Sequence, residues 1–249
     1  MSPGLRRAGR LVAMLATALL ALQLFFLLRI ALMAVVAPES TTFQRSEIWR
    51  LVRDKHRLPW SQESEPAERL SDNLRRAVIA SEDSGFVDHH GVEWDAVERA
   101  WSRNEKAEAR AARVRKGPDG KPRAVAPKVV GGSTISQQLA KNLFLSGERS
   151  IVRKAQELVI TMMLETVLGK ARILTLYLNN VEWGEGVFGA QAAAEHYFRT
   201  SASALGPAQA ARLAVMLPAP KRFEKSPSSP YILGRSGTIV ARMNAVDLP

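Results

Sequence analysis

The chain has 249 residues and no cysteine, and its 35 lysine and arginine residues against 24 aspartate and glutamate residues leave a formal net charge of +11. Without cysteine there are no disulfides, no thiolate chemistry and no cysteine-ligated zinc. The positive charge favours anionic partners such as nucleic acid, phosphorylated substrates or acidic lipid headgroups, without choosing among them. Length and a hydrophobic content of 46% allow one sizeable core, alone or with a membrane segment.

Residues 11–37 predict a transmembrane signal anchor. The run from Leu11 to Leu28 is apolar except for Thr17 and Gln23, which is close to the roughly 20 residues that cross a bilayer core. Apolar character resumes after Arg29, so the span can tilt while that guanidinium reaches the interface.

The basic tail 1–10 predicts the orientation of the anchor. Three arginines precede the span, and basic flanks stay in the cytoplasm, so the remainder of the chain is expected on the periplasmic side of the inner membrane. A cleaved signal peptide is the alternative, because small residues occur near Ala37. The apolar stretch exceeds the roughly 7 to 15 residues of a signal core, which favours a retained anchor.

A polar connector is predicted at 38–70 and a single, mainly α domain at 71–249. Ser71 or Asp72 is expected to cap a helix that starts at Leu74. The best helix predictions are 133–143 and 151–179, followed by a glycine turn at 184–189 and two more helices. The segment 104–128 is predicted to be a mobile basic loop, and Val129–Gly132 is the one modest strand candidate.

Glu82 to Gly91 form the first constellation with chemical potential. Carboxylates at a helix end beside Phe86 can have their protonation tuned by desolvation. A solvated helix terminus explains the same residues in isolation. A metal site is disfavoured, because the adjacent His89 and His90 lack the spacing of helical zinc ligands.

The second constellation, Gly131 to Asn142, predicts an anion site at a helix start. Thr134 and Gln137 match a capping box, and free N–H groups at such an end favour a phosphate. Thr134, Gln138 and Lys141 are spaced to project from one helix face. An ordinary capped helix with a wet polar face accounts for the same pattern.

The third constellation, Arg153 to Glu165, places Arg153 and Glu157 one helical turn apart beside an apolar stripe. Taken locally, this is a surface ion pair on an amphipathic core helix. The helical pattern then continues to Tyr177 and Asn179, and Tyr177 is interpreted as a core residue.

The four patterns occur in one order: E-D-x-x-F-x-x-H-x-G, G-G-S-T-I-x-Q-Q-L-x-K-N, R-K-x-x-E-x-x-x-x-x-x-L-E and I-L-x-x-Y-L-N. This series closely resembles the signature motifs of the biosynthetic peptidoglycan glycosyltransferases, across roughly residues 74–220. That family includes the glycosyltransferase domains of class A penicillin-binding proteins. The chain length and single anchor resemble the monofunctional type.

The resemblance implies a mainly α, lysozyme-like fold and the polymerisation of lipid II into β-1,4-linked glycan strands. It assigns Glu82 as the general base and Glu157 as a second essential carboxylate on the diphosphate side. Lys141 and Arg153 hold the leaving diphosphate. The other implied substrate-binding residues are Asp83, Phe86, His89, Ser133, Thr134, Gln138 and Asn179.

The resemblance also implies a divalent cation, Mg or Mn, near Glu157, and no organic cofactor. Expected partners are lipid II, the growing strand, membrane lipids and other cell-wall synthases, with no nucleic acid. Two rival functions stay open: a lysozyme-type lytic hydrolase, which needs no diphosphate grip, and a non-catalytic membrane scaffold. Transpeptidase activity is disfavoured, because neither S-x-x-K nor K-T-G occurs. Ser136, where threonine is commoner, and the lack of an Asn-Pro pattern after Pro220 are departures from the family.

Overall fold

The computed structural model describes residues 3–95, 98, 102–103, 105–106, 115–116, 122–123, 132–145, 147 and 150–249. Helices make up most of this part, which confirms the mainly α prediction. The candidate strand at 129–132 lies almost wholly outside the described residues, as does most of the basic segment 104–128. Within that segment, β2 (Arg115–Lys116) and β3 (Pro122–Arg123) form an antiparallel pair.

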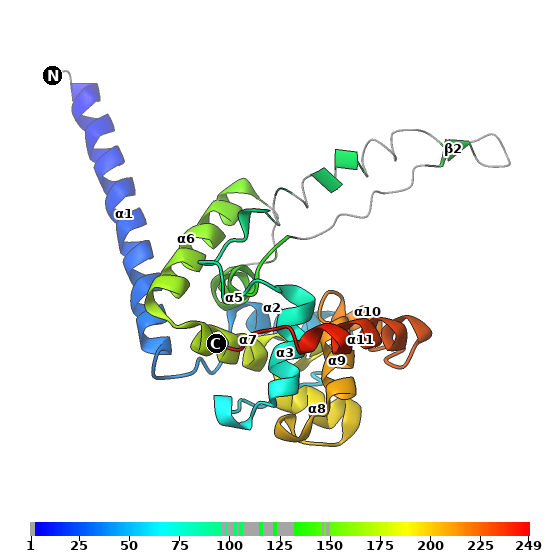
Figure 1. Cartoon of the computed structure of the whole chain (residues 1–249). Coiled ribbons are helices and arrows are strands. Elements are labelled where there is room, and N and C mark those ends of the chain that lie inside the picture. Colours follow the sequence, from blue (N-terminus) through cyan, green and yellow to red (C-terminus); the bar gives the residue numbers. More distant parts are fainter. Residues whose placement is uncertain are drawn as a thin grey trace.

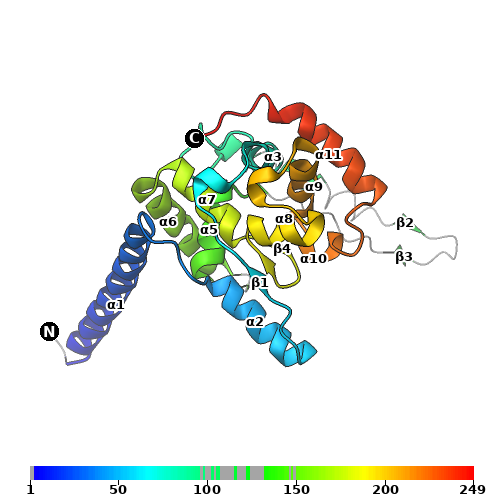
Figure 2. The same ribbon diagram turned by 90° about the horizontal axis from the view of Figure 1, so that it is seen from below.

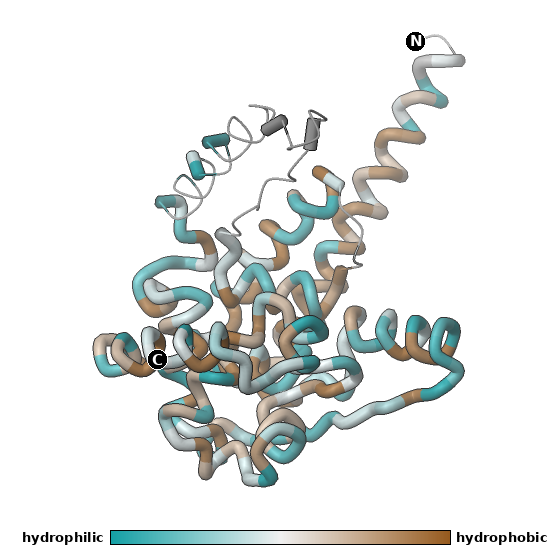
Figure 3. The backbone as a smooth tube through the Cα atoms, turned by 90° about the vertical axis from the view of Figure 1, so that its right-hand side faces the viewer, coloured by the Kyte–Doolittle hydropathy of each residue, from teal (hydrophilic) through white to brown (hydrophobic). Residues whose placement is uncertain are grey.

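Helix α1 (Pro3–Met33) is a single rod whose amino-terminal part extends away from the rest of the molecule (Figure 1). It contains the one candidate membrane span in the described part of the chain, Arg6–Met33. Hydrophobic residues run along much of this helix (Figure 3). The large apolar residues between Leu11 and Leu22 are exposed, as suits a segment whose solvent is lipid.

The connector begins with α2 (Thr42–Lys55), a helix that sequence reasoning did not predict. The hydroxyl of its N-cap, Thr41, accepts a hydrogen bond from the backbone N–H of Gln44. The side-chain oxygen of Gln44 accepts one from the backbone N–H of Thr41. Thr41 and Gln44 are buried, and α2 contacts α5, so this part of the connector belongs to the domain (Figure 2). Strand β1 (Ser61–Gln62) and the 3-10 turn η1 (Ala67–Arg69) complete it.

Helix α3 (Asp72–Glu82) is capped by the hydroxyl of Ser71, one of the two caps that the sequence predicted. It packs against α9 (Pro207–Met216) and α11 (Pro230–Met243), with the short α10 (Pro220–Phe223) between those two. The helix predicted over 203–217 is confirmed as α9, which starts only at Pro207. Helix α11 lies in the tail for which the sequence predicted no element.

A second group of helices contains α5 (Ile135–Phe144), α6 (Ile151–Val167) and α7 (Lys170–Asn180). Both α6 and α7 contact α5. The prediction of one continuous helical stretch over 151–179 is wrong in one respect, because the chain breaks at Leu168 and Gly169. Gly169 caps α7, so the apolar stripe of α6 and that of α7 can face α5 from different directions.

The predicted glycine turn is a small hairpin of β4 (Glu182–Gly184) and β5 (Val187–Phe188). Strand β1 joins β5 in parallel, which gives the order β1-β5-β4. Gly186 has a φ of 75°, and a Cβ there would lie 1.9 Å from the carbonyl oxygen of Pro59. Only glycine fits this crossing. Helix α8 (Ala190–Phe198) and the 3-10 turn η2 (Ala202–Ala204) follow, and α8 was predicted.

Candidate active site

The loop after α3 is fastened to the start of α5 through Asp83. One carboxylate oxygen of Asp83 accepts the backbone N–H of Ile135 at 2.9 Å, and the other lies 2.9 Å from His89 Nε2. Because Gly91 N–H donates to His89 Nδ1 at 3.1 Å, the ring proton is on Nε2 and points to Asp83. Asp83 is almost fully buried, so its described contacts serve to position this loop.

Three other motif residues complete this joint. Thr134 caps α5 in the predicted box with Gln137, and its hydroxyl donates to the carbonyl of Gly91 at 2.6 Å. Gly91 has a φ of 88°, and a Cβ there would lie 2.8 Å from Thr161 Cγ2. Phe86 is fully buried, with the ammonium of Lys170 lying 4.5 Å from its ring centroid. These residues therefore support the loop that follows α3.

Glu82 ends α3 and lines a pocket of about 100 Å³ together with Gly132 and Ser133. One oxygen of its carboxylate accepts a hydrogen bond from Gln138 Nε2 at 3.1 Å, and the other accepts one from the Ser81 hydroxyl at 3.4 Å. Burial raises the pKa of Glu82 above its ordinary value of 4.5, and these two hydrogen bonds oppose the rise. Such a carboxylate is a stronger base than an exposed one.

The amide of Gln138 is held by Tyr177. The Tyr177 hydroxyl donates to Gln138 Oε1 at 2.9 Å, which directs the NH₂ end of the amide toward Glu82. Tyr177 is a core residue as predicted, with 1% of its surface exposed, and burial raises its pKa well above 10. Sequence reasoning missed its orienting role. The only available signal was its place in the I-L-x-x-Y-L-N motif.

A larger pocket of about 340 Å³ adjoins the first and carries a surplus of positive charge. Its charged residues are Lys141 from α5 and Arg153, Lys154 and Glu157 from α6. The buried Glu157 accepts a hydrogen bond from Arg153 Nη1 at 2.8 Å and pairs with Lys154 through its other oxygen. Three cations against one anion leave a net charge of +2, which suits a diphosphate.

Desolvation against the pocket wall lowers the pKa of Lys141, and repulsion from Arg153 and Lys154 adds to this effect. Attraction to Glu157 opposes it. A crowded group of cations gains stability when an anion arrives between them. The electrostatics of this pocket therefore fit an anionic ligand.

The two pockets share one wall. Ser133 lines both, and Gln138 lines the larger one while it donates to Glu82 in the smaller. The family resemblance assigned Glu82, Lys141, Arg153 and Glu157 to one site, and the fold brings all four to these adjoining pockets. The aromatic wall formed by Phe43 of α2 was missed, because nothing in the connector sequence pointed to this place.

Asn179 lies elsewhere. Its side-chain oxygen accepts the Glu65 N–H at 2.9 Å, and its amide donates to the Glu65 carbonyl at 2.8 Å. The residue is buried and lines neither pocket, so it ties the connector to α7. Its substrate-binding role stays a prediction.

The described residues do not form a metal centre. No group of three or more histidine or acidic side chains gathers within the part of the chain that the structure describes. Near the larger pocket, both oxygens of Glu157 already face cations. This arrangement does not test the cation expected near Glu157, so Mg or Mn stays a prediction.

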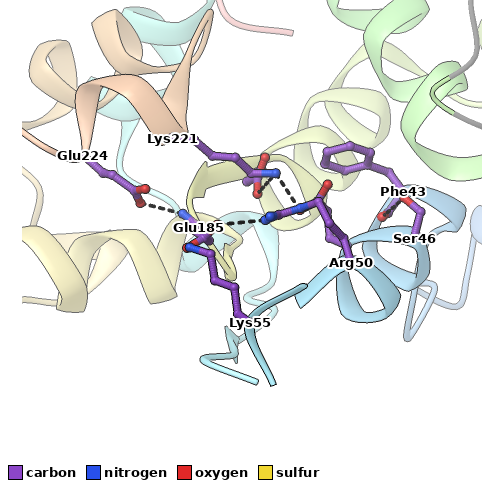
Figure 4. A network of polar contacts seen from close by, with 9 residues as sticks. Phe43, Ser46, Arg50, Lys55, Glu185, Lys221 and Glu224 are labelled. Atoms are coloured by element: carbon purple, nitrogen blue, oxygen red, sulfur yellow. Dashed lines mark hydrogen bonds and ion pairs between the residues drawn. The ribbon is translucent and has the colours of Figure 1, made fainter. Parts of the chain in front are cut away.

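A polar network behind Phe43 connects α2, the β4–β5 hairpin and α10 (Figure 4). Arg50 donates to Glu47 at 2.8 Å and to Glu185 at 2.9 Å. Lys221 lies 2.5 Å from Glu47 and 3.2 Å from Glu182. Burial, with the nearby Glu47, raises the pKa of Glu182 to about 7, against the pull of Lys221. This network holds the α2 wall of the larger pocket in place.

Comparison with known proteins agrees with this geometry. The chain matches the Transglycosylase family over residues 54–117 and 121–244. It is 50% identical over 237 residues to a biosynthetic peptidoglycan transglycosylase of Paraburkholderia xenovorans, covering 95% of this chain and 91% of that protein. A protein of the same name from Burkholderia ambifaria is 50% identical over 234 residues, covering 94% and 88%.

Fold, site and relatives thus define a membrane-associated helical enzyme with a carboxylate pocket beside a cationic one. The chain belongs to the transglycosylase family. The family resemblance that the sequence motifs indicated is confirmed.

Proposed function

We propose that this peptidoglycan glycosyltransferase joins lipid-diphosphate-linked sugar units into β-1,4-linked glycan strands, with Glu82 as general base. The observation that carries the proposal is the shared wall of Ser133 and Gln138. It joins the half-buried carboxylate of Glu82 to a pocket with three cations. Glycosyl transfer from a diphosphate needs a base near the acceptor hydroxyl and cations near the leaving diphosphate, a short distance apart.

On the acceptor side, the oxygen of the sugar 4-hydroxyl attacks the anomeric carbon of the donor, and Glu82 takes the proton. Desolvation, which raises the pKa of Glu82, makes its carboxylate a more effective proton acceptor. Tyr177 and Gln138 keep that carboxylate in one orientation. Such positioning removes the entropy of searching for the reactive geometry.

On the donor side, the bond between the anomeric carbon and the diphosphate oxygen breaks, and the lipid diphosphate departs with both electrons. Lys141, Arg153 and Lys154 face the negative charge that develops on this group. Fixed cations stabilise such a charge better than bulk water does, because they are already oriented. Glu157 holds Arg153 and Lys154 in place through its two oxygens.

The reaction inverts an α-linked donor to a β-linked product in one displacement. One base and a stabilised leaving group suffice, so no covalent sugar–enzyme intermediate forms. A lysozyme-type hydrolase is the weaker candidate, because it has no use for a pocket with three cations. Lipid II, the growing strand and membrane lipids are the proposed partners, together with other cell-wall synthases.

We place the amino terminus in the cytoplasm and the domain on the periplasmic face. Arg6, Arg7 and Arg10 at the free end of α1 support this orientation. The lipid-linked donor then meets the enzyme at the outer surface of the inner membrane.

The deciding experiment measures glycan polymer formed from purified lipid II by the full chain in detergent micelles. Glu82→Gln keeps the size of the side chain and removes the base, and a loss of about 10² to 10⁴ in kcat is expected. Glu68→Gln, at an exposed site, serves as the matched control and should retain full activity. Polymer formation by Glu82→Gln at the rate of the control would reject the proposed base. Cleavage of finished glycan without use of lipid II would identify a hydrolase.

A further inference from the structure

The last third of α1 is docked on the domain. Phe26, Ile30 and Met33 are buried, whereas the large apolar residues between Leu11 and Leu22 are exposed. These three positions share one helix face with Gln23. Phe26 meets Phe144 of α5 edge to face at 5.3 Å, and Arg172 Nε donates to the Met33 carbonyl at 2.8 Å. The anchor therefore continues into the domain as one of its packed helices.

Gln23 is the polar residue at the top of this docked face, inside the apolar span. Its Nε2 donates to Gln156 Oε1 at 2.9 Å, and Gln156 Nε2 donates to Gln23 Oε1 at 3.0 Å. An unpaired amide in apolar surroundings is costly, so the two side chains satisfy each other where no water does. We call this reciprocal pair the amide clasp.

Gln156 precedes Glu157 on α6 and lies three residues after Arg153. These two neighbours form the ion pair on the wall of the cationic pocket. The first turns of α6 have little other cover, because Ile151 is 90% exposed and Val152 is 80% exposed. Helix α6 contacts α5 and α7 within the domain and α1 outside it. Rotation of α6 about its axis would move the clasp and the ion pair together.

We propose that the amide clasp positions α6, so that the anchor helix acts as an outer support of the pocket that binds the donor diphosphate. Gln23 and Gln156 are positioning residues, because neither lines the described pockets. The proposal rests on the proposed function of that pocket. It goes further in making the membrane anchor a working part of the site.

The first test asks whether the anchor is docked in a bilayer, without reference to activity. The chain has no cysteine, so any thiol cross-link within it must join the two introduced cysteines. In liposomes, Gln23→Cys with Gln156→Cys should cross-link efficiently with a short bis-maleimide. Thr17→Cys with Gln156→Cys is the matched control, because Thr17 is exposed and lies six residues, or about 9 Å, farther along α1. Equal cross-linking of the two pairs would overturn the docked anchor.

The second test asks whether the clasp affects donor binding. Gln23→Leu should lower kcat/KM for lipid II about threefold to tenfold, because a shift of α6 moves Arg153 and Lys154 relative to the diphosphate while Glu82 keeps its place. Gln23→Leu combined with Gln156→Leu should recover most of the loss, since neither amide is then left unpaired. Thr17→Leu removes a polar group with no role in the clasp and should match the wild type.

Two results would overturn the clasp as a positioning device: a kcat/KM for Gln23→Leu equal to that of Thr17→Leu, or a double variant that recovers none of the loss. Failure of the proposed function is distinguishable from failure of the clasp, because in that case the wild-type chain would form no polymer from lipid II. Cross-linking of the Gln23 and Gln156 positions would be unaffected in that case.

Discussion

The ionisation of Glu182 makes a quantitative prediction about stability. Its pKa in the folded chain is about 7, against an ordinary value of 4.5. Because the folded-state value is raised, the protonated form contributes stability at low pH that is lost as the pH rises from 4.5 to 7. The difference of about 2.5, at about 1.36 kcal/mol for each pH unit, amounts to about 3 kcal/mol.

Glu182→Gln removes this ionisation and retains the size of the side chain. The difference in the free energy of unfolding between the variant and the wild type should grow in favour of the variant by about 2 to 3 kcal/mol as the pH rises from 5 to 8. Lys221 keeps Glu47 as its partner, so the network loses little else. For a chain of this length the gain corresponds to a rise in Tm of about 5 to 10 °C. Thermal unfolding of the full chain in detergent micelles at the two pH values measures it.

Glu185→Gln is the control of opposite sign in the same network. Hydrogen bonds from Lys55 and Arg50 lower the pKa of Glu185, so its charged form contributes stability that is lost as the pH falls. This variant should be less stable than the wild type at pH 8 and approach it in acid. An equal change in Tm at pH 5 and pH 8 for Glu182→Gln would refute the raised pKa of Glu182.

Four further predictions concern the reaction. The kcat for polymerisation should fall in acid through a pKa above 4.5, because Glu82 must be deprotonated to act; a flat profile down to pH 4 would contradict its role. Tyr177→Phe leaves the Gln138 carbonyl unpaired and should lower kcat about threefold to tenfold with the fold intact by circular dichroism; wild-type kcat would refute the orienting role. Lys141→Met should lower kcat about 10²-fold or more, since one fixed cation facing the diphosphate is lost; a rise in KM alone would show that Lys141 serves ground-state binding only. If a divalent cation neutralises part of the diphosphate charge, as the family resemblance implies, removal of divalent cations by EDTA should lower the rate and added Mg or Mn restore it; an unchanged rate would contradict the expected cation.

The sequence determined the candidate membrane helix, the helical class and the family, because these depend on patterns local to the chain. Apolar runs, capping boxes and ordered motifs need no knowledge of distant contacts. Each cap was predicted to within two neighbouring residues for this reason, and the structure selects Ser71 over Asp72 and Thr134 over Ser133. Short strands such as β5, with two residues, leave no periodicity to read.

The tertiary structure alone decided which neighbours the functional residues have. Gln138 meets Tyr177 across 39 positions of sequence, and Gln23 meets Gln156 across 133. Phe43 enters the cationic pocket from a segment that composition presented only as a connector. Local pattern cannot encode such meetings, because they follow from how buried faces of separate helices pack, and packing depends on the whole set of side chains at once.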